Sequence, residues 1–168
     1  QPVAAEGFYT ASKRIFVPEE LSGAYHVFLV ANSDEQLYEK GRAANNLLKA
    51  PGQVEILTAD LEVVDGAAPA EGIAGDRIEV TLSVRNNGPG TASGNWVDAL
   101  YLSRDTTFDP AHDHLFARFH KGGPVAPGET YAPELRATET RLPQRLSGPF
   151  HIFAVADVWE LLSRDMGG

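Results

Sequence analysis

The clearest regularity in the chain is a stretch in which apolar and polar residues alternate. Between residues 78 and 85 the sequence reads Ile-Glu-Val-Thr-Leu-Ser-Val-Arg, and Asn-Asn-Gly-Pro-Gly follows at 86–90. Successive side chains of a β-strand point to opposite faces, so this period of two predicts a strand with one face in a core and the other in water. The residues that follow it favour turns. The pattern therefore predicts a strand over 78–85 that ends in a tight turn.

Other short apolar runs, bounded by glycine, proline and asparagine, predict further strands. These expected strands lie at residues 60–64, 96–102, 116–120, 131–140 and 150–156, and nearer the N-terminus at 9–17, 25–31 and 53–57. Both faces of the 96–102 run are largely apolar, so the pattern does not assign its inward side. Residues 35–49 and 159–165 carry weaker, helix-compatible patterns. Many short strands, with 16 glycines and 11 prolines, predict an all-β, immunoglobulin-like antiparallel β-sandwich.

The chain also contains an internal repeat. Residues 17–37 align without a gap with residues 142–162, at a constant offset of 125 residues, and ten of the 21 aligned pairs are identical. The offset is too long for a solenoid unit and suits a whole β-sandwich domain. We therefore expect tandem repeats, with the sequence starting and ending inside a repeat. Residues 1–58 are expected to supply the C-terminal strands of a first repeat, and residues 59–168 a second repeat that lacks its final strand.

Composition narrows the classes of function. The formal charge is −9, from 23 acidic and 14 basic residues, whereas nucleic acids and anionic membranes need a basic surface. There is no cysteine, which excludes disulfides, thiol catalysis and cysteine-ligated metals. The longest apolar runs fall short of the roughly 18 residues of a membrane span, so membrane insertion is not expected. The sequence also lacks the nucleophile-elbow, phosphate-loop and zinc-protease motifs, and we expect no enzymatic activity.

One loop carries candidate metal ligands. Asp105, Asp109 and Asp113 recur every four residues between two expected strands. Ca²⁺ takes six to eight oxygen ligands in irregular geometry, so this loop is a candidate calcium site, although its spacing is not that of an EF-hand. The alternative is a solvated loop in which aspartates form turns with their own backbone. His112 and His114 could suggest zinc, but a third ligand at suitable spacing is missing. We expect no obligatory cofactor and leave Ca²⁺ as a hypothesis.

Several segments together resemble the CARDB repeat, the cell adhesion related domain found in bacteria. The segments that carry the resemblance are Asp60-Leu61, the run from Val84 to Gly88, the run from Trp96 to Asp105, and the Pro143 to Gly148 turn. In the first repeat, Tyr38-Glu39 followed by Asn45-Asn46 is similar to the family's closing signature before its last strand. The resemblance implies an immunoglobulin-like fold, an extracellular or cell-surface location in a bacterium or archaeon, and a role in adhesion.

Three hypotheses follow for function. The first is a non-catalytic structural or interaction module that mediates adhesion or acts as a spacer, with a protein or carbohydrate surface ligand. The second is a binding module stabilised by calcium at the acidic loop. The third is a carbohydrate-binding accessory domain of a secreted hydrolase, which an exposed aromatic pair would favour. A sandwich without its last strand has an open edge. We therefore also expect residues 53–57 to pair with the second repeat, within the chain or with another copy.

Overall fold

The computed structural model describes all residues except 1–2, 5, 19, 42, 134–140 and 159–168. The chain divides into two units, residues 1–56 and residues 57–168, and each is described by itself. The described residues contain ten strands and one short 3-10 helix, and every pairing between named strands is antiparallel. The expected all-β fold is therefore confirmed.

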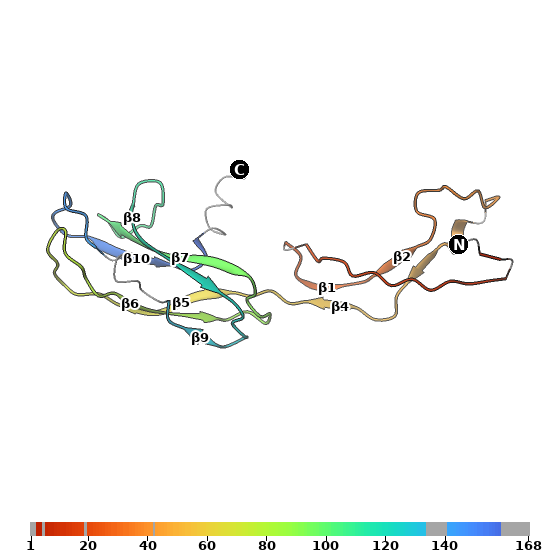
Figure 1. Cartoon of the computed structure of the whole chain (residues 1–168), viewed down its shortest axis with the longest axis horizontal. Helices are drawn as coiled ribbons and strands as arrows, with labels where there is room; N and C mark the ends of the chain where they lie inside the picture. Colours follow the sequence, from red (N-terminus) through yellow and green to blue (C-terminus); the bar gives the residue numbers. More distant parts are fainter. Residues whose placement is uncertain (1–2, 5, 19, 42, 134–140, 159–168) are drawn as a thin grey trace. The chain divides into compact units, whose positions relative to one another are not determined.

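Two three-stranded sheets make up the second unit (Figure 1). One sheet has the order β10-β7-β8, with β10 at His151–Val155, β7 at Asn95–Ser103 and β8 at His114–Gly122. The other has the order β5-β6-β9, with β5 at Leu61–Ala67, β6 at Thr81–Asn86 and β9 at Thr130–Tyr131. The unit is thus an antiparallel sandwich, as the alternating pattern of its strands predicts.

The main core lies between these sheets. On β6 the residues at every second position, Leu82, Val84 and Asn86, are buried, so the period of two identifies the inward face correctly. Leu82 and Val84 pack in one cluster with Leu100 and Leu102 from β7. Burial of such aliphatic side chains is the main source of stability in a sandwich of this kind. Contact between β6 and β7 is therefore part of what joins the two sheets, together with side chains from β5, β8 and β10.

Strand β7 is buried on both faces, which explains why its pattern does not reveal an inward side. From Trp96 to Ser103 every residue is buried. Leu100 and Leu102 face the main core, whereas Val97, Ala99 and Tyr101 form a second cluster on the outer face of the sheet. The loop after β7 and the segment after β10 cover that outer face, through Phe108 and Val158. A central strand covered on both sides has no polar face to alternate with.

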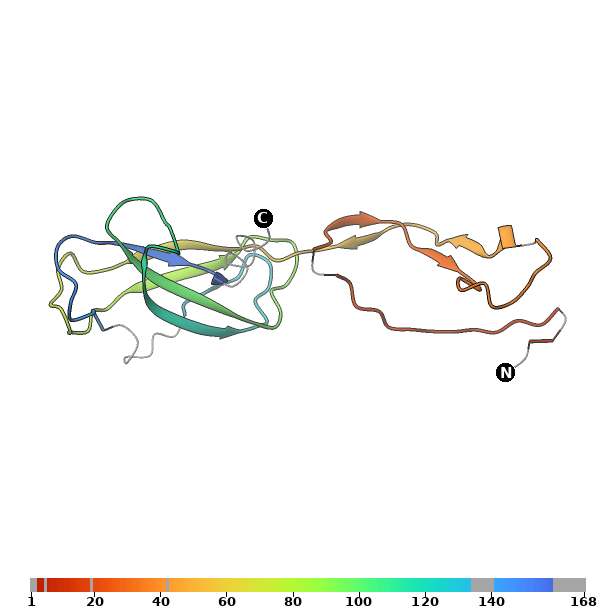
Figure 2. The same ribbon diagram turned by 90° about the horizontal axis from the view of Figure 1, so that it is seen from above.

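The first unit has a different organisation. Its strands are β1 (Gly23–Tyr25), β2 (Phe28–Val30), β3 (Leu47–Lys49) and β4 (Val54–Ile56), with the 3-10 helix η1 at Ala43–Asn45. Figure 2 shows them as a narrow ribbon in which β1 pairs with β4 and β2 pairs with β3. None of the described residues of this unit is buried. A two-stranded ribbon lacks the second layer that would enclose its side chains.

Several expectations about individual strands need correction. Residues 9–17 form no strand, because within the described part of the first unit no other segment pairs with them. Residues 35–49, whose helix-compatible pattern is too interrupted to predict a substantial helix, hold the short 3-10 helix η1 and the strand β3. Residues 53–57 contain β4, which pairs with β1 inside the first unit and not with a strand of the second. Strand sharing between chains stays a prediction. Most of the expected 131–140 strand, and residues 159–165, lie outside the described residues.

Candidate functional site

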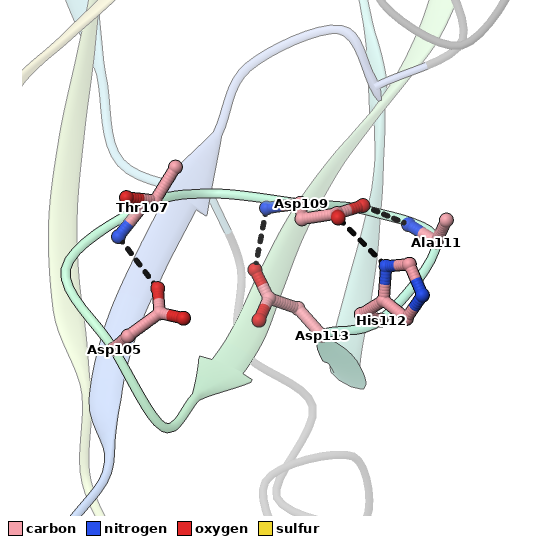
Figure 3. Close-up of polar contacts among 6 residues, drawn as sticks. All are labelled: Asp105, Thr107, Asp109, Ala111, His112 and Asp113. Carbon is pink, nitrogen blue, oxygen red and sulfur yellow. Dashed lines mark hydrogen bonds and ion pairs between the residues drawn. The ribbon is translucent and has the colours of Figure 1, made fainter.

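The candidate metal loop connects the end of β7 to the start of β8. Asp105 lies at its beginning, and its Oδ1 accepts a hydrogen bond from the backbone N–H of Thr107 at 2.8 Å (Figure 3). This is the geometry in which an aspartate side chain caps a turn formed by its own backbone. At this position the carboxylate is therefore used to shape the loop.

Asp109 and Asp113 bond across the same loop. The backbone N–H of Asp109 donates to Oδ2 of Asp113 at 2.7 Å, and the N–H of Asp113 donates to the carbonyl oxygen of Asp109 at 2.7 Å. Oδ1 of Asp109 also accepts from the N–H of Ala111 at 2.9 Å. Between these residues the chain makes a compact turn, visible in Figure 3. Each of the three carboxylates thus accepts a hydrogen bond from a loop N–H group.

His112 adds a charge contact on the exposed side of the turn. Its Nδ1 lies 2.7 Å from Oδ2 of Asp109, and both side chains are exposed. The hydrogen bond from His112 lowers the pKa of Asp109, and the same contact raises the pKa of His112 above its usual value. Since protonated imidazole does not bind zinc, the contact works against a metal role for His112.

The loop brings Asp109 and Asp113 together but directs Asp105 at a separate turn. No group of three histidine or acidic side chains is placed to hold a metal ion anywhere in the described part of the chain. The hydrogen bonds match the alternative set out for this loop, in which aspartates form turns. Calcium binding at Asp105, Asp109 and Asp113 stays a prediction.

A buried polar network that sequence reasoning missed connects the two sheets. The indole N–H of Trp96 on β7 donates to the hydroxyl of Tyr131 on β9 at 2.8 Å, and that hydroxyl donates to Oδ2 of Asp98 at 2.8 Å. Oδ1 of Asp98 accepts from the backbone N–H of Asp157 at 3.1 Å. Asp98 is 1 % exposed, and the two rings meet edge to face. Trp96 is therefore a core tryptophan, and its polar atom is satisfied.

Burial determines the electrostatics of this network. It raises the pKa of Asp98 above the usual value, although the hydrogen bonds from Tyr131 and from the backbone of Asp157 oppose the shift. Burial also raises the pKa of Tyr131 well above its usual range, so its hydroxyl keeps its proton. The hydrogen bonds of this network hold the two sheets together, so its role is structural. A lone aspartate within an apolar strand was the sequence signal that could have identified it.

A second buried anchor lies at the turn after β6. The Nδ2 of Asn86 donates to the carbonyl oxygens of Gly90 and Val125, and its Oδ1 accepts from the N–H groups of Asp60 and Gly88. Gly88 cannot carry a side chain here, because a Cβ would lie 2.5 Å from backbone atoms of the segment before β5. The side-chain amide of Asn86 therefore joins three segments: the one that leads into β5, the turn after β6 and the segment before β9.

The second unit has an open groove of about 570 Å³ beside the turn before β10. Ile78, Leu102, Leu142, Leu146 and Phe150 contribute its apolar lining, and Glu71 is the one titratable residue among the described lining residues. General acid–base catalysis usually needs two suitably placed groups. The groove does not offer that arrangement.

The CARDB family model matches residues 58–158, which cover the described sandwich almost completely. The chain belongs to the CARDB family. This confirms the resemblance noted in the sequence, and CARDB domains are non-enzymatic, adhesion-related modules of bacterial surface or extracellular proteins. Searches of curated proteins and of solved structures return no match. Among the described residues, no helix of this CARDB chain is long and apolar enough to cross a membrane.

Proposed function

We propose that this CARDB chain is a non-catalytic adhesion or spacing module of an extracellular or cell-surface protein. The observation that carries the proposal is that the polar side chains that could do chemistry are used to hold the structure together. Asp98 and Asn86 are buried and hydrogen-bonded to backbone and side chains, and the aspartates of the 105–113 loop bond to their own turn. Such a domain offers a stiff frame with exposed loops, which suits contact with a surface ligand.

The carbohydrate-binding alternative finds no exposed aromatic pair on the described part of the sandwich, whereas the first unit exposes the neighbouring side chains of Phe8 and Tyr9. In the described residues of the second unit, each tryptophan, tyrosine and phenylalanine is buried or half-buried, so an exposed stacking pair is not found there. Trp159 lies outside the described residues. Flat sugar recognition by stacking needs an accessible aromatic face. The ligand in the adhesion proposal is therefore a protein or carbohydrate surface, and stacking on aromatic rings of the described sandwich is not the mode of contact.

A flow chamber tests the proposal. Beads coated with the 168-residue chain are passed over glass that carries bacterial cell-wall fragments, with albumin-coated beads as the control. Adhesion predicts that chain-coated beads are retained at wall stresses that remove the control beads. Equal removal of both would contradict the adhesive role. A matched set of beads coated with chain lacking the 105–113 loop charges (Asp105→Asn, Asp109→Asn and Asp113→Asn) shows whether that loop makes the contact.

A further inference from the structure

The turn after β6 contains an asparagine directly followed by a glycine, Asn87-Gly88, and this pair occurs once in the chain. In flexible polypeptide an asparagine before a glycine loses its side-chain amide readily, because glycine has no Cβ to hinder ring closure. The backbone nitrogen of Gly88 bonds to Cγ of Asn87, the proton it gives up passes to the departing amide nitrogen, and ammonia leaves. Water then opens the resulting succinimide ring, which yields aspartate or isoaspartate. The pair is therefore a candidate site of spontaneous modification.

In the folded chain the attacking nitrogen is already occupied. The N–H of Gly88, a buried residue, donates to Oδ1 of Asn86 at 3.1 Å. Ring closure replaces that N–H with a bond to carbon, so a buried hydrogen bond is lost. The backbone is also closely packed, since a Cβ on Gly88 would lie 2.5 Å from the nitrogen of Asp60 and from the carbonyl oxygen of Thr58. The folded turn therefore excludes the ring.

The carbon under attack is held as well. Nδ2 of Asn87 donates to Oε2 of Glu62 on β5, and the backbone N–H of Asn87 donates to the carbonyl oxygen of Asp60 at 2.7 Å. Asn87 is exposed, so water reaches its amide without any change in the fold. What the fold withholds is the approach of Cγ to the nitrogen of Gly88, which requires these contacts to break. Parts of a domain open locally at a lower free energy than the whole domain unfolds.

We propose that Asn87-Gly88 is a deamidation site that the fold keeps closed and that opening of the turn after β6 exposes. The modification rate is then the rate in unfolded chain multiplied by the fraction of time for which the turn is open, as for proteolysis of a transiently opened segment. The reaction consumes only water, so no partner protein is required. The amount of modified Asn87 thus records how long the turn has been open during the life of the molecule.

The product opposes closure of the same turn. Asn87 donates to Glu62, whereas a carboxylate at position 87 cannot donate and carries the same charge as Glu62. Like charges in such a contact repel. Isoaspartate also lengthens the backbone directly before Gly88, where the turn lies against the segment that leads into β5. Both products therefore favour the open turn, and a reversible opening becomes a permanent one.

Peptide mass spectrometry of the 168-residue chain, incubated at mildly alkaline pH, measures the deamidation of Asn87. Chain unfolded in concentrated urea at the same pH gives the reference rate. The folded chain should react at least about tenfold more slowly. Below the unfolding transition the rate should change little with added urea, because local opening exposes little surface. A folded rate equal to the reference, or a rate that rises in step with global unfolding, would overturn the proposal.

A pair of variants identifies the contact that protects the site. Asn86→Ala removes the acceptor of the Gly88 N–H and should raise the rate in the folded chain at least about tenfold. Phe108→Ala is the control, because Phe108 packs in the cluster on the outer face of the sheet, near the opposite end of β7. Its rate should stay within about threefold of the wild type. Equal increases in the two variants would contradict local protection, and the urea series on the wild type decides the question if Asn86→Ala does not fold.

The effect of the product on the turn has its own test. Asn87→Asp stands for the product with a normal backbone and should lower the unfolding midpoint of the second unit. In a Glu62→Gln background, which removes the facing charge, the same substitution should shift the midpoint by no more than about half as much. Equal shifts in the two backgrounds would show that the new carboxylate is not repelled by Glu62, and the permanent opening would be refuted.

Discussion

The indole nitrogen of Trp96 and the hydroxyl of Tyr131 are 2.8 Å apart, and their rings meet edge to face with centroids 5.9 Å apart. Trp96 belongs to β7 and Tyr131 to β9, so this contact crosses from one sheet to the other. The hydroxyl also donates to Asp98, which makes it the central atom of the network. A hydroxyl in this position satisfies two buried partners at once.

Removal of that hydroxyl should therefore be costly. Tyr131→Phe leaves the Trp96 N–H and one oxygen of Asp98 without a partner, and we expect a loss of about 2–4 kcal/mol in the free energy of unfolding. Urea denaturation followed by circular dichroism measures it. Tyr101→Phe is the matched control, because the Tyr101 side chain is largely buried but its hydroxyl is not a buried atom without a partner and makes no hydrogen bond within the described residues, so its loss should cost under about 0.5 kcal/mol. Similar losses for the two variants would rule out the bridging role.

The raised pKa of Asp98 predicts a pH dependence of stability. Burial, the largest cause, raises this pKa above the ordinary value of 3.8, so between the two values the folded state binds more protons than the unfolded state. The contribution of Asp98 to the free energy of unfolding must then fall as pH rises through that window. The difference between wild type and Asp98→Asn, measured by urea denaturation at successive pH values, should show this decline. A difference that grows with pH would mean that the pKa is lowered.

Asn86 gives a prediction about the turn after β6. Asn86→Ala removes two donated and two accepted hydrogen bonds at a fully buried position, and we expect a loss of about 3 kcal/mol or more. The neighbouring Asn87 is exposed, and its side chain bonds only to Glu62 within the described residues. Asn87→Ala should cost less than about 1 kcal/mol. Thermal unfolding of the two variants beside wild type distinguishes a buried anchor from a replaceable turn residue.

The calcium hypothesis makes a separate prediction. A ligand that binds only the folded state stabilises it by about 2.7 kcal/mol at a hundredfold excess over its Kd. If the 105–113 loop binds Ca²⁺, the unfolding midpoint should rise by several degrees in excess Ca²⁺ and return in chelator. The rise should vanish in Asp109→Asn with Asp113→Asn. An unchanged midpoint would leave these aspartates as the turn-forming residues that their hydrogen bonds indicate.

Periodicity predicts the outlines of this fold because half-buried strands must alternate. The alternation at 78–85 identifies the inward residues of β6, although the strand begins at Thr81. Periodicity does not identify the inward residues of β7, because this strand is buried on both faces and its sequence has no alternation of apolar and polar residues. Residues 9–17 show that a strand-like sequence is not sufficient to form a strand. Their composition suits a strand, but strands form only where another segment pairs with them.

From the sequence, the candidate site could be predicted only as a set of acidic residues on one loop. Sequence spacing places Asp105, Asp109 and Asp113 between two strands, which is where they lie, but spacing cannot show whether carboxylates turn outward or toward their own backbone. Asn86 and Asp98 were missed for a related reason. An asparagine at the end of a strand looks like any turn residue, and long-range partners such as Val125 or Tyr131 leave no local pattern.

The segment that leads into the second unit is tied down before its first strand begins. The carbonyl oxygens of Thr58 and Asp60 accept from the N–H groups of Gly90 and Asn87, and the N–H of Asp60 donates to Asn86. Tension applied to the chain at this point is therefore divided among several hydrogen bonds, which must break together. The turn after β6 therefore holds the entering segment at several points when the chain is under mechanical load.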